Sequence, residues 1–286
     1  MQDQYSIDKA RVRASFDRAA TSYDAAAVLQ KMVREEMLSR LELIKIDPAT
    51  ILDAGCGTGH GTFALQKCYQ HAQVISLDLA IGMLKQTHMQ APLLKKILGK
   101  KNLVCADIES LPLADASVDL LWSNLALQWC DDLDQVLAEV KRVLTPNGLF
   151  MFSTFGPDTL KELRIASQNG YTHVSRFIDM HDIGDALTRA GMNAPVLDVE
   201  RYTLVYDDVK AVMRDLKLIG AHNATSGRAR GLMAKGFLQN LTKSYEQFRQ
   251  NGKLPATFEV VYGHAWKPEL SSKLEQGLTP IHFKKR

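Results

Sequence analysis

The chain has 286 residues, long enough for one large domain or for a domain with an added lid. Hydrophobic residues make up 46% and charged residues 23%, which is typical of a globular protein and excludes a disordered or collagen-like chain. A net charge of +3 is too small by itself to indicate a nucleic-acid binder. The four cysteines form no CxxC pair, so we expect neither a disulfide framework nor a metal site, and a reducing cytoplasm is the expected location.

The first half of the chain predicts helices followed by alternating strands and helices. Residues 7–46 carry apolar side chains at helical spacing, and Pro48 ends that region. No run of about 18 apolar residues predicts a membrane span. Short apolar runs then alternate with helical segments, which is typical of βαβ units and a parallel sheet covered on both faces. The expected strands lie at residues 51–52, 74–77, 103–105, 118–122 and 149–152, with a turn at 146–148 before the last of them.

The second half of the chain has a looser pattern. We expect a helix near residues 181–190, a strand over 196–206, a basic helical stretch over 207–253 and a last strand at 257–262. These elements predict an α/β protein with a Rossmann-like core, helices before it and a late helical insertion. The expected parts are an N-terminal helical lid (1–48), the core (49–206), the insertion (207–253) and a final strand with a C-terminal tail (254–286).

A glycine-rich loop directly after the first strand is the strongest local motif. It reads Asp-Ala-Gly-Cys-Gly-Thr-Gly over residues 53–59. Glycine permits positive φ and lets a ligand approach the backbone closely, and the N–H groups of the following helix then face that ligand. The spacing is G-x-G-x-G without a following Gly-Lys-Ser/Thr, which excludes a phosphate-binding P-loop. A tight turn without a ligand is the alternative interpretation.

Two aspartates follow the next two predicted strands. Asp78 ends the second strand, where an acidic side chain can accept both hydroxyls of a ribose, and Asp107 ends the third. Either residue alone could simply cap a helix. Because the carboxyl ends of parallel strands meet at one edge of a sheet, we expect both carboxylates to lie beside the glycine loop.

These motifs together resemble the class I S-adenosylmethionine-dependent methyltransferases. The resemblance covers about residues 50–155 and includes Asp78-Leu79 with Met83-Leu84, the stretch 106–112 and the stretch 142–148. It implies a seven-stranded, mostly parallel sheet with helices on both faces. It also implies S-adenosylmethionine as the cofactor.

A narrower resemblance extends over nearly the whole chain. The stretches 16–20, 23–24, 123–130, 152–154, 160–163 and 252–260 are similar to the malonyl-acyl-carrier-protein O-methyltransferases of biotin synthesis. The block Asn-Leu-Ala-Leu-Gln-Trp at 124–129 is the most specific of them. The sequence departs from the family pattern at 145–148, where Thr-Pro-Asn-Gly replaces Lys-Pro-Gly-Gly, and this change affects only a turn.

The resemblance implies a role for each candidate site residue. It places Gly55, Gly57 and Gly59 under the amino-acid part of the cofactor, and it lets Asp53 orient the loop or the amino group. Asp78 would hold the ribose and Asp107 the adenine amino group. The remaining expected cofactor contacts are Leu79, Met83, Ile108, Asn124 and Gln30. Tyr23 and Asn124 would position the methyl acceptor, and Met83 could equally be ordinary helix core.

The implied reaction transfers the sulfonium methyl group to the free carboxylate of a malonyl thioester on acyl carrier protein or coenzyme A. That carboxylate is ionised at neutral pH, so no general base is required, and the sequence offers no acid/base constellation. One alternative is a methyltransferase for a free small acid such as trans-aconitate, or for a quinone precursor. A protein that binds S-adenosylmethionine without catalysis is another. The Asn/Asp-Pro-Pro-Tyr/Phe motif of nucleic-acid amino methylation is missing, and we expect no nucleic-acid partner.

The basic segment is the expected contact for the carrier. Residues 209–253 contain nine basic and two acidic side chains. Such a run can be only a solvated surface, but its positive potential also fits an acidic acyl carrier protein. The candidate contacts with substrate or carrier are Arg228, Arg230, Lys235 and Lys243.

Overall fold

The computed structural model describes residues 7–92, 102–167, 177–219 and 235–269. In these ranges the strands form one seven-stranded sheet in the order β3-β2-β1-β4-β5-β7-β6. Neighbours from β3 to β5 are parallel, and β7 runs antiparallel between β5 and β6, so the predicted, mostly parallel sheet is confirmed. The strands are β1 (Thr50–Ala54), β2 (Gln73–Asp78), β3 (Leu103–Cys105), β4 (Val118–Asn124), β5 (Leu144–Phe155), β6 (Asn193–Tyr206) and β7 (Leu254–Trp266).

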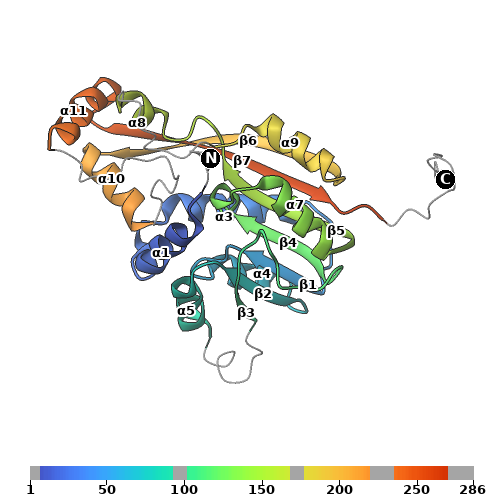
Figure 1. The fold of residues 1–286 in the computed structure, drawn as a ribbon. Coiled ribbons are helices and arrows are strands. Elements are labelled where there is room, and N and C mark those ends of the chain that lie inside the picture. Colours follow the sequence, from blue (N-terminus) through green and yellow to red (C-terminus); the bar gives the residue numbers. More distant parts are fainter. Residues whose placement is uncertain (1–6, 93–101, 168–176, 220–234, 270–286) are drawn as a thin grey trace.

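Helices cover both faces of this sheet (Figure 1). Three precede the first strand, as the N-terminal periodicity predicts: α1 (Lys9–Ala19), α2 (Tyr23–Ala26) and α3 (Val28–Glu42). Two more, α10 (Val209–Leu218) and α11 (Lys235–Tyr245), lie in the connection between β6 and β7. The others are α4 (His60–Cys68), α5 (Ile81–Gln90), α7 (Leu133–Val143), α8 (Lys161–Ala166) and α9 (Met180–Arg189), with short 3-10 turns at Leu127–Trp129 and Glu246–Phe248.

The buried strands divide the core into two layers. Leu149 and Met151 of β5 belong to a buried cluster that includes α3 and continues to α10 and α11, whereas Phe150 and Phe152 belong to the cluster that includes α7 and α9. Successive side chains of a strand point to opposite faces, so one strand supplies both layers. All four side chains are almost fully buried because helices cover both faces.

The start of β5 differs from the predicted turn. Residues 146–148 lie inside the strand, with Asn147 at a φ of 61°. Leu144 pairs with Val118 and Leu149 with Leu120, so the segment between them forms a bulge. The predicted turn residues therefore bend the strand instead of preceding it.

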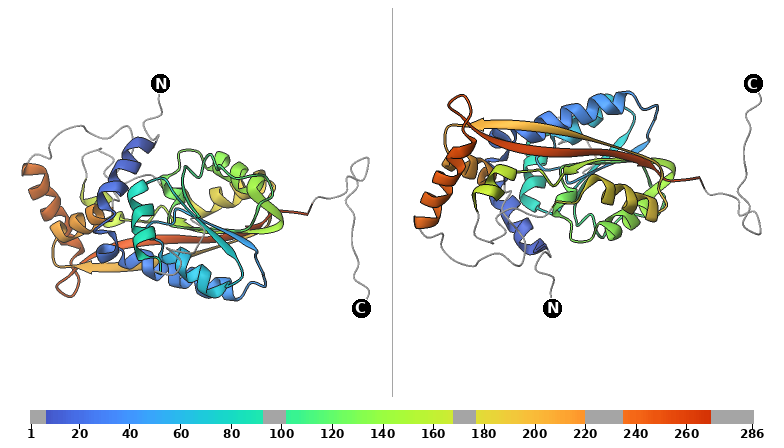
Figure 2. Two further views of the ribbon diagram at one scale, coloured as in Figure 1. Left: turned by 90° about the horizontal axis from the view of Figure 1, so that it is seen from below. Right: turned by 90° about the horizontal axis from the view of Figure 1, so that it is seen from above.

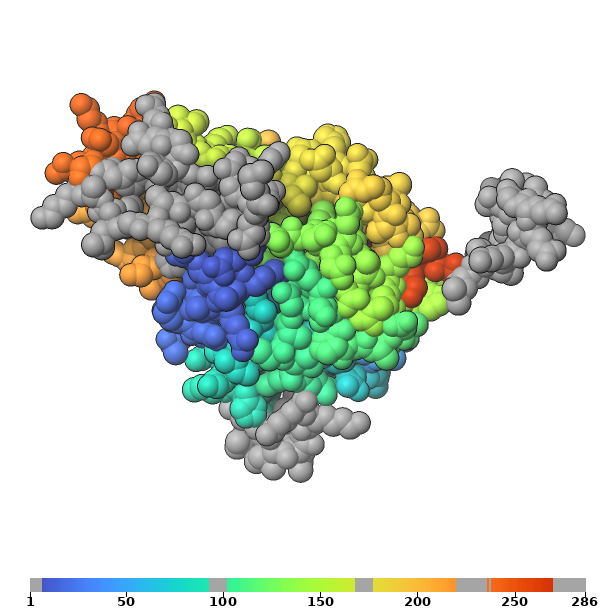
Figure 3. Space-filling view, in the orientation of Figure 1, coloured from blue at the N-terminus to red at the C-terminus, as the bar shows by residue number. Residues whose placement is uncertain are grey.

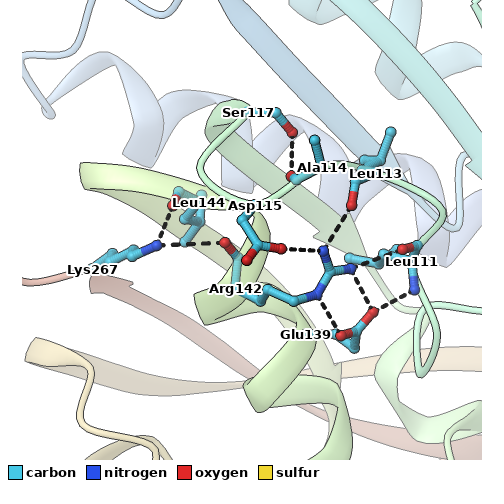
Figure 4. Close-up of polar contacts among 9 residues, drawn as sticks. All are labelled: Leu111, Leu113, Ala114, Asp115, Ser117, Glu139, Arg142, Leu144 and Lys267. Carbon is cyan, nitrogen blue, oxygen red and sulfur yellow. Dashed lines mark hydrogen bonds and ion pairs between the residues drawn. The ribbon is translucent and has the colours of Figure 1, made fainter.

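Arg142 lies beside this bulge and makes several hydrogen bonds that stabilise this end of the sheet (Figure 4). Its guanidinium donates to Glu139, to Asp115 and to the backbone carbonyls of Leu111 and Leu113. Lys267 donates to the carbonyl of Leu144 at 2.6 Å, near the end of α7. Both side chains lie where β5 begins, so they stabilise the edge opposite to the carboxyl ends of the strands.

Helices α1 and α2 lie at the carboxyl ends of the strands, whereas α3 packs along one face of the sheet. Figure 2 shows α1, α10 and α11 gathered at that end of the sheet, and in Figure 3 α1 lies directly against α5. Ser22, between α1 and α2, donates from its hydroxyl to the carbonyl of Leu218 at the end of α10. In the described ranges, no helix is both long and apolar enough to cross a membrane. The helices placed before and after the core in sequence therefore meet over one edge of the sheet.

Candidate functional site

The glycine loop begins where β1 ends, and its three glycines have different roles. Gly55, Gly57 and Gly59 have φ values of 79°, 56° and 91°, a region that favours glycine. A Cβ atom on Gly55 would lie 2.4 Å from Ala126 Cβ, and one on Gly59 would lie 2.6 Å from Thr87 Cγ2. A Cβ on Gly57 would meet nothing within 4 Å. Gly55 and Gly59 therefore allow close packing, while Gly57 faces open space.

Two buried aspartates stand beside this loop. Asp78 accepts hydrogen bonds from the backbone N–H of Gly57 at 2.9 Å and of Ala80 at 2.8 Å. Asp53 accepts a hydrogen bond from the Thr62 hydroxyl at 2.6 Å. Burial raises the pKa of Asp78 to about 6 and that of Asp53 to about 7, since a low dielectric disfavours the charged form. A cationic ligand bound beside the glycine loop would favour the ionised form of both carboxyl groups.

A cavity extends from the glycine loop along the ends of β2 and β3. Its wall at this end includes four of the predicted contacts: Leu79, Met83, Asp107 and Ile108. Met83 is 1% exposed, so it is both core and cavity wall. Lys9 of α1 also lines this end and bridges Asp107 at 3.0 Å and Glu109 at 3.1 Å.

A second cavity opens on the other side of the loop. It is lined by Asp53, His60 and Trp122, and by Lys31 and Arg34 from α3. Arg34 is half-buried, and in the described part of the chain its guanidinium has no ion-pair partner. Its charge lowers the pKa of Asp53 slightly, against the larger effect of burial. This cavity therefore combines a buried acid with an available cation.

The two cavities share a junction, where Tyr23, Gln30 and Asn124 meet Gly55 and Gly57. The Asn124 amide donates to the carbonyl of Gln30 at 3.2 Å, and its oxygen accepts from the Ser153 hydroxyl at 2.9 Å. The Gln30 side-chain oxygen is buried and has no hydrogen-bond partner among the residues that the structure describes. The junction thus holds a fixed amide and an acceptor available to a ligand donor.

The far end of the first cavity is apolar. Its wall comes from the end of β5, the start of α8, the end of α10 and β7. The residues are Phe155, Thr159, Leu160, Phe177, Leu216, Ile219 and Phe258. None of them belongs to the predicted site, because apolar residues at strand and helix ends have the same pattern as core residues.

Two buried glutamates, Glu259 and Glu162, fix the segments that form this apolar wall. Glu259 of β7 accepts a hydrogen bond from Asp158 N at 2.8 Å and pairs with Arg201 at 2.9 Å. Its backbone N–H donates to the Thr159 hydroxyl, and that hydroxyl donates to the Glu259 carbonyl. Glu162 accepts from the backbone N–H and the hydroxyl of Thr257. The wall between β5 and α8 is therefore fixed by polar contacts outside the cavity.

Of the four predicted substrate contacts in the basic segment, Lys243 is the one whose side chain the structure describes, and it lines neither cavity. Arg228 and Arg230 lie outside the described residues, as does the side chain of Lys235. Lys243 is exposed on α11. Three other basic residues of the same segment, Lys210, Arg214 and Lys217, are exposed on α10 at a spacing that places them on one helix face, and the end of the same helix contributes Leu216 and Ile219 to the first cavity.

Comparison with known proteins identifies the family. Residues 52–152 match the model of the family described as "Methyltransferase domain". The malonyl-[acyl-carrier protein] O-methyltransferase of Methylovorus sp. is 63% identical over 99% of this chain and 97% of its own length. The same enzyme of Laribacter hongkongensis is 56% identical over 99% of this chain and 98% of its own. The chain belongs to the malonyl-[acyl-carrier protein] O-methyltransferase family.

Solved structures agree with this family at the level of the fold. The YcgJ protein of Bacillus subtilis has a TM-score of 0.56 at 16% identity and covers 82% of this chain and 99% of its own. Phosphoethanolamine N-methyltransferase 2 of Haemonchus contortus, solved with S-adenosyl-L-methionine, has a TM-score of 0.53 at 17% identity, with 88% of this chain and 57% of its own covered. The class I methyltransferase fold implied by the sequence motifs is thereby confirmed.

The geometry brings most of the predicted cofactor residues to one place. Gly55, Gly57, Asp78, Asn124 and Gln30 all line the cleft, as do the four wall residues named above. Asp53 lines only the second cavity. Gly59 lies at the start of α4 and packs against α5. No group of three or more potential metal ligands occurs among the residues that the structure describes.

Proposed function

We propose that this protein transfers the methyl group of S-adenosylmethionine to the free carboxylate of malonyl-acyl carrier protein. The product is the malonyl methyl ester that primes pimeloyl synthesis for biotin. The observation that carries this proposal is the 63% identity to a malonyl-[acyl-carrier protein] O-methyltransferase over nearly both whole chains. The first cavity supports the proposal, since its end at the glycine loop is polar and its other end is apolar.

The residues of the polar end fit the cofactor. The space beside Gly57 that a side chain would fill is open, so a ligand can approach this backbone. Asp78 has further lone pairs for the ribose hydroxyls, with Leu79, Met83 and Ile108 around the nucleoside. Asp107 would accept from the adenine amino group, and Asp53 would face the cationic amino group of the methionine part. The unpartnered oxygen of Gln30 provides one more acceptor.

Arg34 completes this set in a way the sequence motifs did not indicate. It lines the second cavity with Asp53 and lacks an ion-pair partner in the described ranges. A zwitterionic amino acid needs an anionic group beside its ammonium and a cationic group beside its carboxylate. We assign the carboxylate of the cofactor's methionine part to Arg34, because a guanidinium binds carboxylates in a bidentate geometry.

The chemistry requires alignment more than proton transfer. When bound, the cofactor supplies an electrophilic methyl group on a cationic sulfur. An unperturbed carboxyl group has a pKa near 4, so the malonyl carboxylate arrives ionised and the protein need not remove a proton. Tyr23, Gln30 and Asn124 at the junction would hold the carboxylate oxygen in line with that methyl group. Positioning of this kind can contribute roughly 7–11 kcal/mol to a reaction barrier.

The exposed basic residues would guide the carrier to the apolar end of the cleft. Lys210, Arg214 and Lys217 share one face of α10, and the end of the same helix lines the cavity. Lys243 adds a charge on α11. Complementary potentials raise association rates, so an acidic carrier domain would meet this surface first. Lys235 and the arginines Arg228 and Arg230 remain proposed contacts for the carrier and the malonyl group.

The test offers malonyl-acyl carrier protein, malonyl-coenzyme A and trans-aconitate in parallel, with mass spectrometry as the readout. We expect the malonyl group on the carrier to gain one methyl group, as an ester that mild base removes. Methylation of trans-aconitate alone would instead identify a methyltransferase for free acids. Cofactor binding without methylation of any acceptor would identify a binding protein and overturn the proposal.

A further inference from the structure

Asp24, the second residue of α2, gathers donors from three different elements. The Thr58 hydroxyl donates to Oδ1 at 2.6 Å, and the Gln90 side chain donates to Oδ2 at 2.7 Å. His60 Nε2 lies 3.3 Å from the same Oδ2 atom. Burial alone would raise the pKa of Asp24, but the donors from Thr58, Gln90 and His60 hold it below its ordinary value. The arrangement therefore favours an ionised carboxylate.

Each of the three partners belongs to an element that surrounds the polar end of the cleft. Thr58 is 3% exposed and lies between Gly57 and Gly59 in the glycine loop. His60 is the first residue of α4, and Gln90 is the last residue of α5. Hydrogen bonds and the contact with His60 thus connect the short helix α2 to the glycine loop, to α4 and to α5.

Tyr23, the residue before Asp24, is one of the residues that line both cavities. Burial together with the nearby charge of Asp78 raises the pKa of its hydroxyl, so the phenol stays neutral. Its ring lies 6.5 Å from that of Phe16 in α1. The apolar contact beneath α1 and α2 is small, since the cluster there contains Ala20, Ala80, Met83, Phe16 and Tyr23. Phe16 also packs edge-on against Trp129, with ring centroids 5.3 Å apart, and the hydrogen bonds of Asp24 add to these apolar contacts.

A second aspartate makes a parallel connection from α1. Asp17 accepts a hydrogen bond from the backbone N–H of Gly82 at 2.6 Å, in the first turn of α5. This turn follows directly after Asp78 and Leu79. The two N-terminal helices are thus attached to the same backbone segments that carry the proposed contacts to ribose and nucleoside.

We propose that Asp24 is a positioning residue that holds Tyr23 over the cleft and couples closure of α1 and α2 to order in the glycine loop. The inference rests on the cofactor assignment of the proposed function. Because coupling between two binding events is reciprocal, a ligand that orders the loop stabilises the closed helices, and the closed helices slow its release. Asp24 also lines the second cavity, and in this proposal it acts through its neighbour Tyr23 and its partner Thr58.

The experiment compares wild type with Asp24→Ala and Thr58→Val, using S-adenosylhomocysteine as the probe. We expect each substitution to raise the calorimetric Kd about 5- to 20-fold, mainly through faster release in stopped flow. The double variant should have about the same Kd as the weaker-binding single variant, because both substitutions break the Asp24–Thr58 hydrogen bond. Hydrogen exchange of residues 9–26 should be slowed by the probe in wild type and much less in Asp24→Ala. Asp207→Ala is the matched control, since it breaks the Asp207–Lys253 pair away from both cavities.

Unchanged probe release in both single variants, or additive effects in the double variant, would overturn the coupling. If Asp24→Ala fails to fold, Gln90→Ala removes another donor at an exposed position and must show the same direction of change. Failure of the proposed function can be distinguished from failure of this inference. Wild type that binds the probe but does not methylate a malonyl carrier leaves this inference standing, whereas wild type that does not bind the probe removes both.

Discussion

The two ends of the cleft are built on different principles. At the cofactor end the proposed ligand contacts are backbone and carboxylate groups: the glycine loop, Asp78 and Asp53. The Gly57 N–H donates to Asp78 and the Thr62 hydroxyl donates to Asp53, at the ends of two parallel strands. At the acyl end the wall is aromatic and aliphatic, and the polar groups that hold it, Glu162 and Glu259, make their contacts outside the cavity. In the proposed function the first end would recognise its ligand by direct polar contacts, whereas the second end would offer an apolar surface.

The two ends therefore differ in the amino-acid substitutions that they can tolerate. A polar contact made by backbone cannot be replaced by another side chain, and a glycine at positive φ allows little substitution. An apolar wall keeps its character through many exchanges, provided that its volume is preserved. One fold can therefore retain its cofactor while its acceptor changes.

The largest effect should come from Gly57. Gly57→Val places a branched side chain in the open space beside the loop, at a φ of 56°. Strained backbone of this kind costs about 1–3 kcal/mol, and the side chain also fills the proposed ligand space. We expect calorimetry to detect no S-adenosylhomocysteine binding in a folded variant, while Gly57→Ala binds weakly. Binding at wild-type affinity by Gly57→Val would remove the cofactor from this loop.

Charge reversal on α10 should have a smaller effect, confined to the acyl end. The triple variant Lys210→Glu, Arg214→Glu, Lys217→Glu should lower kcat/KM for the malonyl carrier about 10-fold and flatten its salt dependence, because steering is screened by ions. Lys235→Glu with Lys243→Glu should act in the same direction. Malonyl-coenzyme A should be largely unaffected, and Lys67→Glu on α4 is the control. Equal losses on both acceptors would reduce this helix face to a solvated surface.

The last prediction concerns folding stability instead of ligand binding, and it follows from the burial of Asp53. The pKa of Asp53 is raised to about 7 when folded and is near 3.8 when unfolded, so the folded state binds more protons between pH 4 and 7. This carboxyl therefore contributes less stability as pH rises through that window, at about 1.4 kcal/mol for each unit of raised pKa. Asp53→Asn should gain stability relative to wild type from pH 5 to pH 8, measured by thermal unfolding. A difference that stays constant with pH would contradict the raised pKa.

The cofactor end could be predicted from the sequence, and the acyl end could not. Gly57 and Asp78 stand out because they lie at the carboxyl ends of two strands, where glycine suits a positive φ and an aspartate can accept from a ribose. Phe155 and Phe258 give no such signal, since they follow the alternation of any buried strand. Arg34 was missed because a single basic residue on an amphipathic helix is usually solvated, and only the fold places it beside Asp53.

The contrast between the two ends is tested most directly by one matched pair of variants, Asp78→Ala and Glu259→Gln. The measurement is the Kd of S-adenosylhomocysteine together with the KM for the malonyl carrier at saturating cofactor. Loss of a charge-assisted acceptor costs about 1.5–3 kcal/mol, so Asp78→Ala should raise the Kd at least about 10-fold and leave the KM nearly unchanged. Glu259→Gln should raise the KM and leave the Kd unchanged. If each variant changes both quantities equally, the two ends are not separate and the account is wrong.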